Sequence, residues 1–588
     1  MQVIYNESNN NLIVVCNPYE KDLPKALPNR RYSNKIKAWL VPCNRINARL
    51  ITETWFNDRR VNISDKVRKI IVGALEGPIV IKKPFPSKYR FKHVCYEHQK
   101  KALDYIYSLK KSALFVEMGL GKTKIAQDKM GVHYLEKKIN ALLVVCPYSI
   151  RFNWVVEFSK HCAVPYDIAV IDLKTTSDVR KIDSYINKKI DTLKILIVGV
   201  ESLQSGRAIA KCSTFIDTHK AGVIVDEAHT IKTHSASRTK NLIAISKNAV
   251  YKLIMTGTPV SQGILDLYGQ FLFLDPNIMG VGDFWSYKAR YTITEEIRVG
   301  GNRKINKVVG YKNVEELLEI IKPFVFQCTK DEALDLPDKV KIKRYVTLTK
   351  EQQKLYNEIK NERVAILPNI SDVKIPDTML VVQYILTMYT TLQQVLGGFV
   401  TRGTGEYTST GNEIRETLPV VIRDKNPKIL ELKNIIAELV DSEQVIIWAK
   451  YRAEVFMIAQ QLEYYMTDKF EKGCEIFIDK TDEERKQIIN NMNNKKTRYF
   501  ISTHKSGGTG ITLNTVSYVV YYSNSFSQLE RSQTEDRNHR IGQKRKVTYI
   551  DLVVKDTVDT TILKALKDKK DLADYVKECL SDGKDYVE

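Results

Sequence analysis

A short glycine loop constrains the fold of this chain more than any other feature. The loop follows the apolar stretch 113–116, precedes a helical pattern, and reads Met118-Gly119-Leu120-Gly121-Lys122-Thr123. This order predicts a strand, a tight loop and the start of a helix, whose backbone N–H groups attract phosphate. We predict that these six residues bind a nucleotide, with Lys122 neutralising the β- and γ-phosphates and the Thr123 hydroxyl holding Mg²⁺. Val116 stands where a phosphate loop usually has its first glycine.

Short apolar stretches alternate with helical patterns in two regions of the chain. Buried strands are predicted at 141–145, 195–198, 223–225 and 253–255 in the first region, and at 444–448, 498–502, 518–522 and 547–553 in the second. Apolar strands that alternate with helices are typical of parallel sheets covered on both faces. The chain is therefore predicted to be an α/β protein with two parallel-sheet lobes.

The segments outside these regions predict a separate domain and an insertion. Residues 1–85 precede the glycine loop, and the Lys-Lys-Pro-Phe-Pro sequence at 82–86 is typical of a domain boundary. Residues 276–424 have a longer helical periodicity, which turn-rich stretches interrupt at 299–302 and 401–412. We predict a small N-terminal α+β domain at 1–85, a first lobe at 86–275, helical insertions and a linker at 276–424, and a second lobe at 425–588.

An acidic pair completes the first half of the predicted ATP site. Asp226-Glu227-Ala228-His229 comes directly after the apolar stretch 221–225. A carboxylate at the carboxyl end of a strand can hold Mg²⁺, and its neighbour can orient the attacking water. We assign the metal role to Asp226 and the base role to Glu227. A solvated acidic turn would explain an isolated Asp-Glu pair, but it would not explain a pair that follows the glycine loop in this order.

An arginine-rich run far along the chain predicts the second half of the site. The run is Gln533-Thr534-Glu535-Asp536-Arg537-Asn538-His539-Arg540-Ile541-Gly542-Gln543. Arginine can stabilise the charge that develops on a transferred phosphoryl group, so Arg537 and Arg540 are predicted to be catalytic. If they come from the second lobe, hydrolysis depends on closure of the two lobes.

The charge of the chain favours a polyanionic partner. Its 91 basic and 69 acidic residues give a net charge of +22, which makes nucleic acid the leading candidate. A lysine-rich surface that serves only solubility would explain the same charge. The cysteines show no zinc spacing, and no apolar stretch reaches the length of about 20 residues that a membrane-spanning helix needs. We therefore expect a soluble, intracellular monomer without a membrane partner, in the cytoplasm of a prokaryotic or virus-infected cell or in a nucleus.

From residue 96 to 553 the motifs resemble those of the Swi/Snf family of DNA translocases in helicase superfamily two. The 537–543 run is the most specific match, and the variant glycine loop is familiar from this superfamily. Further matches are His98-Gln99, Trp154 with Glu157-Phe158, Met255-Thr256-Gly257-Thr258-Pro259 and the glycine motif at 506–513. The resemblance implies two RecA-like lobes, ATP and Mg²⁺ as cofactors, nucleotide contacts by His98, Gln99 and Gly510, and coupling of hydrolysis to lobe movement by Thr256, Gly257, Thr258 and Gln533.

Two segments depart from the family pattern. Gln327-Cys328-Thr329-Lys330 lacks the arginine pair that relatives carry before the lysine. Ser523-Asn524-Ser525-Phe526-Ser527 replaces an aspartate and a Trp-Asn-Pro run. The coupling between the lobes is therefore expected to differ in detail from that of the relatives, while the phosphate chemistry is unaffected.

The resemblance also implies a DNA track across both lobes. Hydroxyl groups and turn N–H groups suit phosphate contacts without base reading. The candidate DNA contacts are Tyr148, Ser149 and Ser202 in the first lobe, and Lys450, Thr503, Lys505, Ser506, Gly507 and Gly508 in the second.

The N-terminal segment is similar to the HARP module of the annealing helicases. Its basic residues Arg30, Arg31, Lys35 and Lys37 surround Tyr32 and Trp39. The two arginines are predicted to contact phosphates while Trp39 stacks on an exposed base. The alternative is a small β-rich domain in which the aromatic residues are core.

Three functions are consistent with these motifs. The first is a double-stranded-DNA translocase that remodels DNA or protein–DNA complexes, including forked or annealing substrates in repair or replication. The second is a helicase that separates strands of DNA or RNA, although residues 537–543 favour the translocase. The third is an ATP-gated adaptor that clamps DNA without moving. A complete ATPase site is consistent with both the translocase and this adaptor.

Overall fold

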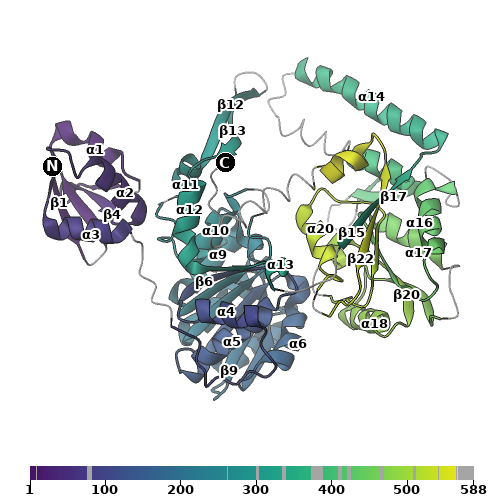
Figure 1. Cartoon of the computed structure of the whole chain (residues 1–588), viewed down its shortest axis with the longest axis horizontal. Coiled ribbons are helices and arrows are strands. Elements are labelled where there is room, and N and C mark those ends of the chain that lie inside the picture. The colour runs from purple at the N-terminus through teal and green to yellow at the C-terminus, as the bar shows by residue number, and fades with distance from the viewer. Residues whose placement is uncertain are drawn as a thin grey trace.

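The computed structural model of the chain contains a small N-terminal domain and two larger lobes (Figure 1). The structure describes residues 1–566, except 8–9, 29, 76–82, 205, 261–262, 282, 300–302, 334–338, 373–388, 408–412, 420–424, 464–468, 508–510, 541 and 565. In the described part of the chain, no helix is long and apolar enough to span a membrane.

The N-terminal domain is a five-stranded sheet with helices packed against it. The strand order is β3-β4-β2-β1-β5, and only the β1–β5 pair is parallel. The core lies between the sheet and two helices, with Trp55 and Ile51 fully buried. The elements are β1 (Gln2–Asn6), β2 (Asn11–Val15), α1 (Asp22–Lys25), β3 (Arg31–Ser33), β4 (Ala38–Pro42), α2 (Arg45–Thr54), β5 (Asn62–Ile63) and α3 (Asp65–Leu75).

The first lobe is a seven-stranded parallel sheet in the order β14-β6-β11-β10-β7-β9-β8. Alternate residues of β7 enter separate cores, with Leu143 and Val145 in one and Leu142 and Val144 in the other. Helices must therefore cover both faces. The strands are β6 (Lys111–Val116), β7 (Ala141–Cys146), β8 (Tyr166–Val170), β9 (Leu193–Gly199), β10 (Ala221–Asp226), β11 (Tyr251–Met255) and β14 (Val325–Cys328).

The helices of the first lobe connect these strands. The connections are short, so each strand is followed closely by its helix or turn, as parallel α/β folds require. The helices are α4 (Glu97–Ile106), α5 (Lys122–Leu135), α6 (Arg151–His161), α7 (Thr176–Asn187), α8 (Gly206–Thr218), α9 (Ser237–Ile245), α10 (Asp266–Leu274), α11 (Phe284–Tyr291), α12 (Val314–Ile321) and α13 (Lys330–Ala333).

The second lobe is a six-stranded parallel sheet in the order β15-β22-β21-β18-β20-β19. Its strands are β15 (Lys339–Val346), β18 (Val445–Ala449), β19 (Lys472–Ile476), β20 (Thr497–Thr503), β21 (Tyr518–Tyr521) and β22 (Val547–Val554). Its helices are α14 (Lys350–Asp372), α16 (Pro427–Glu438), α17 (Arg452–Leu462), α18 (Asp482–Asn493), α19 (His504–Gly507) and α20 (Gln528–Glu535). The predicted α/β class with two parallel-sheet lobes is confirmed, and all eight predicted strands are present.

The region between the lobes differs from the helical insertion that its periodicity predicts. Two antiparallel hairpins occur there, formed by β12 (Thr292–Val299) with β13 (Arg303–Tyr311), and by β16 (Phe399–Tyr407) with β17 (Glu413–Pro419). The described parts of these turn-rich stretches, 299 and 401–407, therefore belong to strands and not to interrupted helices. The tips at 300–302 and 408–412 lie outside the described residues.

The same region also supplies a strand to each lobe. β14 forms the edge of the first sheet beside β6, and β15 forms the edge of the second sheet beside β22. The expected boundaries at 275 and 424 therefore do not coincide with the ends of the two sheets. Pairing at a sheet edge depends on strands that are distant in sequence, so the local pattern does not indicate it.

The N-terminal domain contacts the first lobe through the start of α2. Asn44 Nδ2 donates to the carbonyl of Gly280 at 3.1 Å, and Arg45 forms an ion pair with Glu319 at 2.8 Å. Between them, Ile46 is buried within the core cluster of the first lobe. These contacts tie the domain to the first lobe.

Candidate functional site

The predicted phosphate loop lies between β6 and α5, at the carboxyl edge of the first sheet. Gly119 and Gly121 have φ values of +86° and +80°, which L side chains rarely adopt. The loop is braced from α4, where His98 Nε2 lies 2.9 Å and Gln99 Nε2 lies 3.2 Å from the carbonyl oxygen of Leu120. The two residues predicted to contact the nucleotide, His98 and Gln99, therefore lie against the phosphate loop.

Lys122 is buried at the first position of α5. Its Nζ donates to the carbonyl of Val116 at 2.9 Å. Burial lowers the pKa of Lys122, while the nearby Glu227 and Asp226 oppose that shift. The glycine loop and the acidic pair are thus within electrostatic reach of each other, as the motif order predicts.

Asp226 and Glu227 lie at the carboxyl end of β10, and both are buried. Asp226 Oδ2 accepts a hydrogen bond from the indole Nε1 of Trp154 at 3.0 Å, and Oδ1 accepts one from the backbone N–H of Glu227 at 2.9 Å. Burial and the neighbouring Glu227 raise the pKa of Asp226 to about 7, while Lys122 opposes the shift. These hydrogen bonds fix the orientation of the carboxylate.

Glu227 is connected to the predicted coupling motif. Its Oε2 lies 3.3 Å from His229 Nδ1, which lies 3.4 Å from Thr256 Oγ1. The same hydroxyl accepts a hydrogen bond from the backbone N–H of Thr258 at 3.1 Å. A β-carbon on Gly257 would lie 3.2 Å from the backbone nitrogen of Met118. The motif at 256–258 therefore contacts both the acidic pair and the phosphate loop.

The predicted catalytic arginines reach this site from the second lobe. Arg537 Nη2 lies 3.7 Å from Met118 Sδ, and its other nitrogens donate to the carbonyls of Gln533 and Ile511. Burial lowers the pKa of Arg537 to about 10. Arg540 Nη1 donates to Thr512 Oγ1 at 2.7 Å. The arginines thus lie beside the phosphate loop, although Arg537 is 419 residues from Met118 in the sequence.

The predicted Mg²⁺ ligands have suitable chemistry. A hydroxyl at Thr123 and a carboxylate at Asp226 are hard oxygen donors, and Mg²⁺ is commonly held by one or two carboxylates together with phosphates. Within the described residues, no group of three or more His, Cys, Asp or Glu side chains could hold a metal ion.

The candidate DNA contacts of the first lobe lie together. Tyr148 and Ser149 follow β7, and Ser202 follows the adjacent β9. The backbone N–H of Tyr148 donates to Glu201 Oε2 at 2.9 Å, and the guanidinium of Arg151 lies 3.4 Å from the centre of the Tyr148 ring. Tyr148 and Ser149 are exposed, so this edge of the first sheet is open to a ligand.

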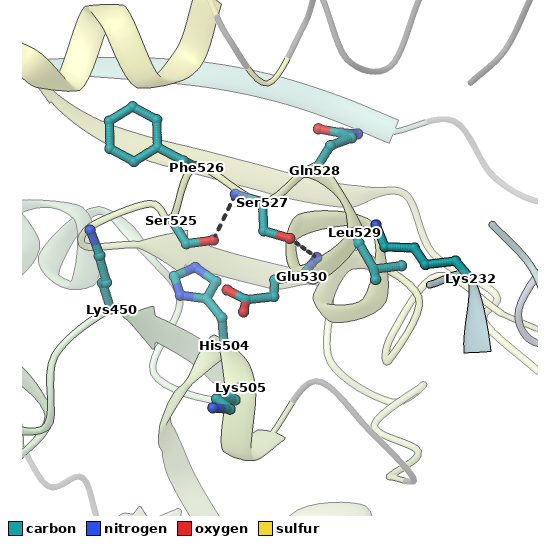
Figure 2. A pocket seen from close by; sticks show the side chains of 10 residues that line it. All are labelled: Lys232, Lys450, His504, Lys505, Ser525, Phe526, Ser527, Gln528, Leu529 and Glu530. Atoms are coloured by element: carbon teal, nitrogen blue, oxygen red, sulfur yellow. Dashed lines mark hydrogen bonds between the residues drawn. The ribbon is translucent and has the colours of Figure 1, made fainter. Parts of the chain in front are cut away.

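A cavity with lysines from both lobes contains two candidate contacts of the second lobe (Figure 2). Lys450 and Lys505 line it from the second lobe, Lys232 from the first, and its volume is about 540 Å³. Burial lowers the pKa of His504 to about 3, so this ring in the wall is neutral at pH 7. The segment that departs from the family pattern also lines it through Ser525, Phe526 and Ser527. The cavity also contains Glu530, and Lys450 Nζ donates to Gln393 Oε1 at 2.6 Å while Lys232 pairs with Asp266 at 3.5 Å, so its charge is mixed.

Other candidate contacts of the second lobe are engaged inside the protein. Thr503 Oγ1 and Ser506 Oγ form a hydrogen bond at 3.0 Å. A β-carbon on Gly507 would lie 2.4 Å from the Trp448 ring, so this glycine allows close packing and the predicted phosphate contact is not needed to explain it. Gly508 and Gly510 lie outside the described residues. Gln533 is buried in α20 and accepts the Arg537 hydrogen bond through its carbonyl.

The N-terminal candidates divide between surface and core. Arg30 and Arg31 are exposed, whereas Trp39 is half-buried and packs against the domain core. The ring of Tyr32 stands against Trp39 with 5.2 Å between ring centres, and 43% of Tyr32 is exposed. Tyr32 is therefore more exposed than Trp39, the residue that is predicted to stack on a base.

Two contacts in the site were not foreseen. In the sequence, Trp154 and His229 stand out only as members of two motifs. Their side chains meet Asp226 and Thr256 through tertiary packing, for which the sequence carries no local signal.

The comparisons with known proteins agree with the motifs. The family model of the SNF2-related domain matches residues 98–396, and that of the helicase conserved C-terminal domain matches 427–542. An uncharacterized ATP-dependent helicase of Mycoplasma pneumoniae is 26% identical over 78% of this chain and 39% of the relative. The DNA annealing helicase and endonuclease ZRANB3 of Homo sapiens is 26% identical over 76% of this chain and 36% of the relative.

A solved structure is also similar. The SWI2/SNF2 ATPase core of Sulfolobus solfataricus, in complex with dsDNA, is 22% identical over 84% of this chain and 95% of that chain, with a TM-score of 0.36. This chain spans less than half the length of the two relatives above. The SNF2-related match alone covers about half of the 588 residues and includes the phosphate loop, the acidic pair and the coupling motif. The chain therefore belongs to the SNF2-related family.

Proposed function

We propose that this chain hydrolyses ATP between its two lobes and uses their movement to translocate along double-stranded DNA. The observation that carries the proposal is the approach of Arg537 and Arg540 from the second lobe to the loop that holds Lys122 in the first. A site divided between two bodies couples hydrolysis to their relative position, because neither half alone stabilises the transferred phosphoryl group.

Each polar group has a proposed role in the reaction. Lys122 neutralises the phosphates, and Glu227 orients water for attack on the γ-phosphorus. Mg²⁺, when bound with ATP, would neutralise phosphate charge beside Thr123 and Asp226. Trp154 holds the Asp226 carboxylate in place through its hydrogen bond. The contacts from Glu227 through His229 to Thr256 lead from the reacting group to the coupling motif.

The DNA track is proposed to run over the lysine-lined cavity and the Tyr148 edge. Lysines from both lobes suit a phosphate backbone that both lobes grip in turn, so lobe closure would advance one grip relative to the other. The proposed contacts carry no base-reading chemistry. Translocation is therefore expected to be independent of sequence.

We expect ATP-dependent displacement of a third strand from duplex DNA, with little unwinding of a plain partial duplex. The proposed contacts on both lobes hold phosphates, so movement of the lobes along the duplex does not require its strands to separate. A triplex-displacement assay and a strand-separation assay under the same conditions measure the two activities. Binding should also weaken steeply with salt, because phosphate contacts dominate.

Other outcomes of these two assays would identify the other two candidate functions. Efficient unwinding of tailed duplexes without triplex displacement would identify a strand-separating helicase. ATP hydrolysis and DNA binding without either activity would identify an ATP-gated clamp. The Glu227→Gln variant serves as the control, since it should bind DNA and displace no strand.

The N-terminal domain is proposed to recognise forked or partly single-stranded DNA through its β3–β4 hairpin. Reversing the charge of Arg31 and Lys35 to glutamate should spare basal ATPase activity and remove the preference for forks over plain duplex. The salt slope of fork binding should fall by about 1 for each lost phosphate contact. Point variants are preferable to deletion, because Ile46 of this domain packs into the first-lobe core.

A matched control uses the same domain. Lys66 and Lys69 on α3 are exposed, and their replacement by glutamate changes the charge by the same amount. Equal loss of fork preference in both double variants would show that only the net charge of the domain matters. An unchanged preference in the hairpin variant would remove the hairpin from the DNA interface.

A further inference from the structure

Lys330 is a buried lysine that connects the two lobes and has no role in the site described above. It follows β14 in the sheet of the first lobe. Its Nζ lies 2.5 Å from Asp536 Oδ1 and 2.6 Å from the carbonyl oxygen of His539, both in the second lobe. The exposed fractions of the Lys330 and Asp536 side chains are 6% and 14%. This ion pair is therefore shielded from water, unlike most surface pairs.

The backbone of Lys330 is attached to the phosphate loop. β14 pairs with β6 so that Cys328 lies opposite Val116. The next residue, Glu117, donates its N–H to the carbonyl of Cys328 at 3.0 Å, and its carboxylate accepts the N–H of Lys330 at 2.9 Å. The lysine is thus anchored where the phosphate loop begins.

The two groups that Lys330 contacts are the direct neighbours of the catalytic arginines. Asp536 precedes Arg537, and His539 precedes Arg540. The approach is close, since a β-carbon on Gly119 would lie 3.0 Å from Arg540 Cβ and 3.8 Å from Lys330 Cε. One ammonium group therefore contacts both Asp536 and His539, the residues that directly precede Arg537 and Arg540.

We propose that Lys330 is a positioning residue that holds the segment 536–540 of the second lobe against the phosphate loop of the first. The proposal rests on ATP hydrolysis between the lobes as the function. Its physical basis is that a charged hydrogen-bond donor between a strand of one lobe and a segment of the other restricts the distance between them. The loss of the ammonium group would leave Asp536 without this partner and would release the arginines from their place beside the loop.

The test compares Lys330→Gln with Lys339→Gln in the full chain. Lys339 is the matched control because its Nζ lies 3.3 Å from Glu535 Oε2, but both of these residues belong to the second lobe. We expect Lys330→Gln to lower kcat by about ten- to hundred-fold with little change in KM for ATP, since a small misplacement of a catalytic group has an effect of this size. Lys339→Gln should leave kcat unchanged, and Lys330→Arg should restore part of the activity.

A second measurement reports on the lobes directly. Fluorescent labels on the exposed Lys181 in α7 and Lys486 in α18, introduced as non-canonical amino acids, give the interlobe distance by energy transfer without any need for hydrolysis. Lys330→Gln and Asp536→Asn should each lengthen or broaden this distance, and the double variant should add nothing further. Asp536→Asn also weakens the contact from the other side, by removing the charge of the acceptor, if Lys330→Gln does not fold.

The outcomes separate the inference from the proposed function. Unchanged interlobe distances and unchanged kcat in folded Lys330→Gln, or an equal loss in Lys339→Gln, would overturn the role of Lys330. If the wild-type protein does not hydrolyse ATP, the proposed function fails, while the distance measurement still shows whether Lys330 holds the lobes together.

Discussion

Lys122→Ala is expected to abolish ATP hydrolysis, with the rate falling by at least about 10³-fold, because the charge that stabilises the transferred phosphoryl group is removed. Lys122 is buried at the start of α5, where its Nζ donates to the carbonyl of Val116 at the phosphate loop. The measurement is the steady-state ATPase rate with saturating duplex DNA. ATP affinity should fall as well, since the same charge contacts the bound phosphates in the ground state.

Glu227→Gln separates binding from turnover at the same site. The amide keeps the size of the side chain but cannot accept a proton from water, so ATP should bind nearly as tightly while turnover stops. Equilibrium binding of a fluorescent ATP analogue distinguishes the two variants. Lys101→Ala, at an exposed position on α4, is the control. Wild-type ATPase rates in folded Lys122→Ala or Glu227→Gln protein would remove the assignment of this site.

Arg540→Ala is expected to reduce kcat by about 10³-fold, the loss typical of an arginine finger, while the KM for ATP changes much less. This factor corresponds to about 4 kcal/mol of transition-state stabilisation. Arg540 lies against Gly119, and its guanidinium is held by Thr512 Oγ1. DNA-stimulated ATPase rates over a range of ATP concentrations give kcat and KM separately.

Arg537→Ala should have the smaller effect on kcat and a larger effect on stability. The Arg537 guanidinium donates to the carbonyls of Gln533 and Ile511, so it holds the end of α20 to the segment at Ile511 that precedes β21. Arg545→Ala is the control for the Arg537 and Arg540 variants, because Arg545 is paired with Glu443 on the surface of the second lobe. A larger kcat loss for Arg537→Ala, at equal melting temperature, would exchange the roles of the two arginines.

The sequence alone predicted the chemistry of the first lobe and the class of the fold. The phosphate loop, Lys122 and the Asp226-Glu227 pair are local features, since each lies between a strand and the next helix or turn within a few residues. Buried parallel strands are apolar along their whole length, which makes them visible as continuous stretches. The eight predicted strands were found for this reason.

Only the tertiary structure decided which distant residues complete the site. Lys330 and Asp536 are 206 residues apart, and Trp154 and Asp226 are 72 residues apart. No periodicity or spacing predicts such pairs, because they depend on the order of strands in a sheet and on the approach of two lobes. The same reason applies to β14 and β15, which lie in a segment expected to be a helical linker but form sheet edges. Gly507 gives the opposite case, since a glycine that resembles a phosphate contact in the sequence is explained in the structure by its packing against Trp448.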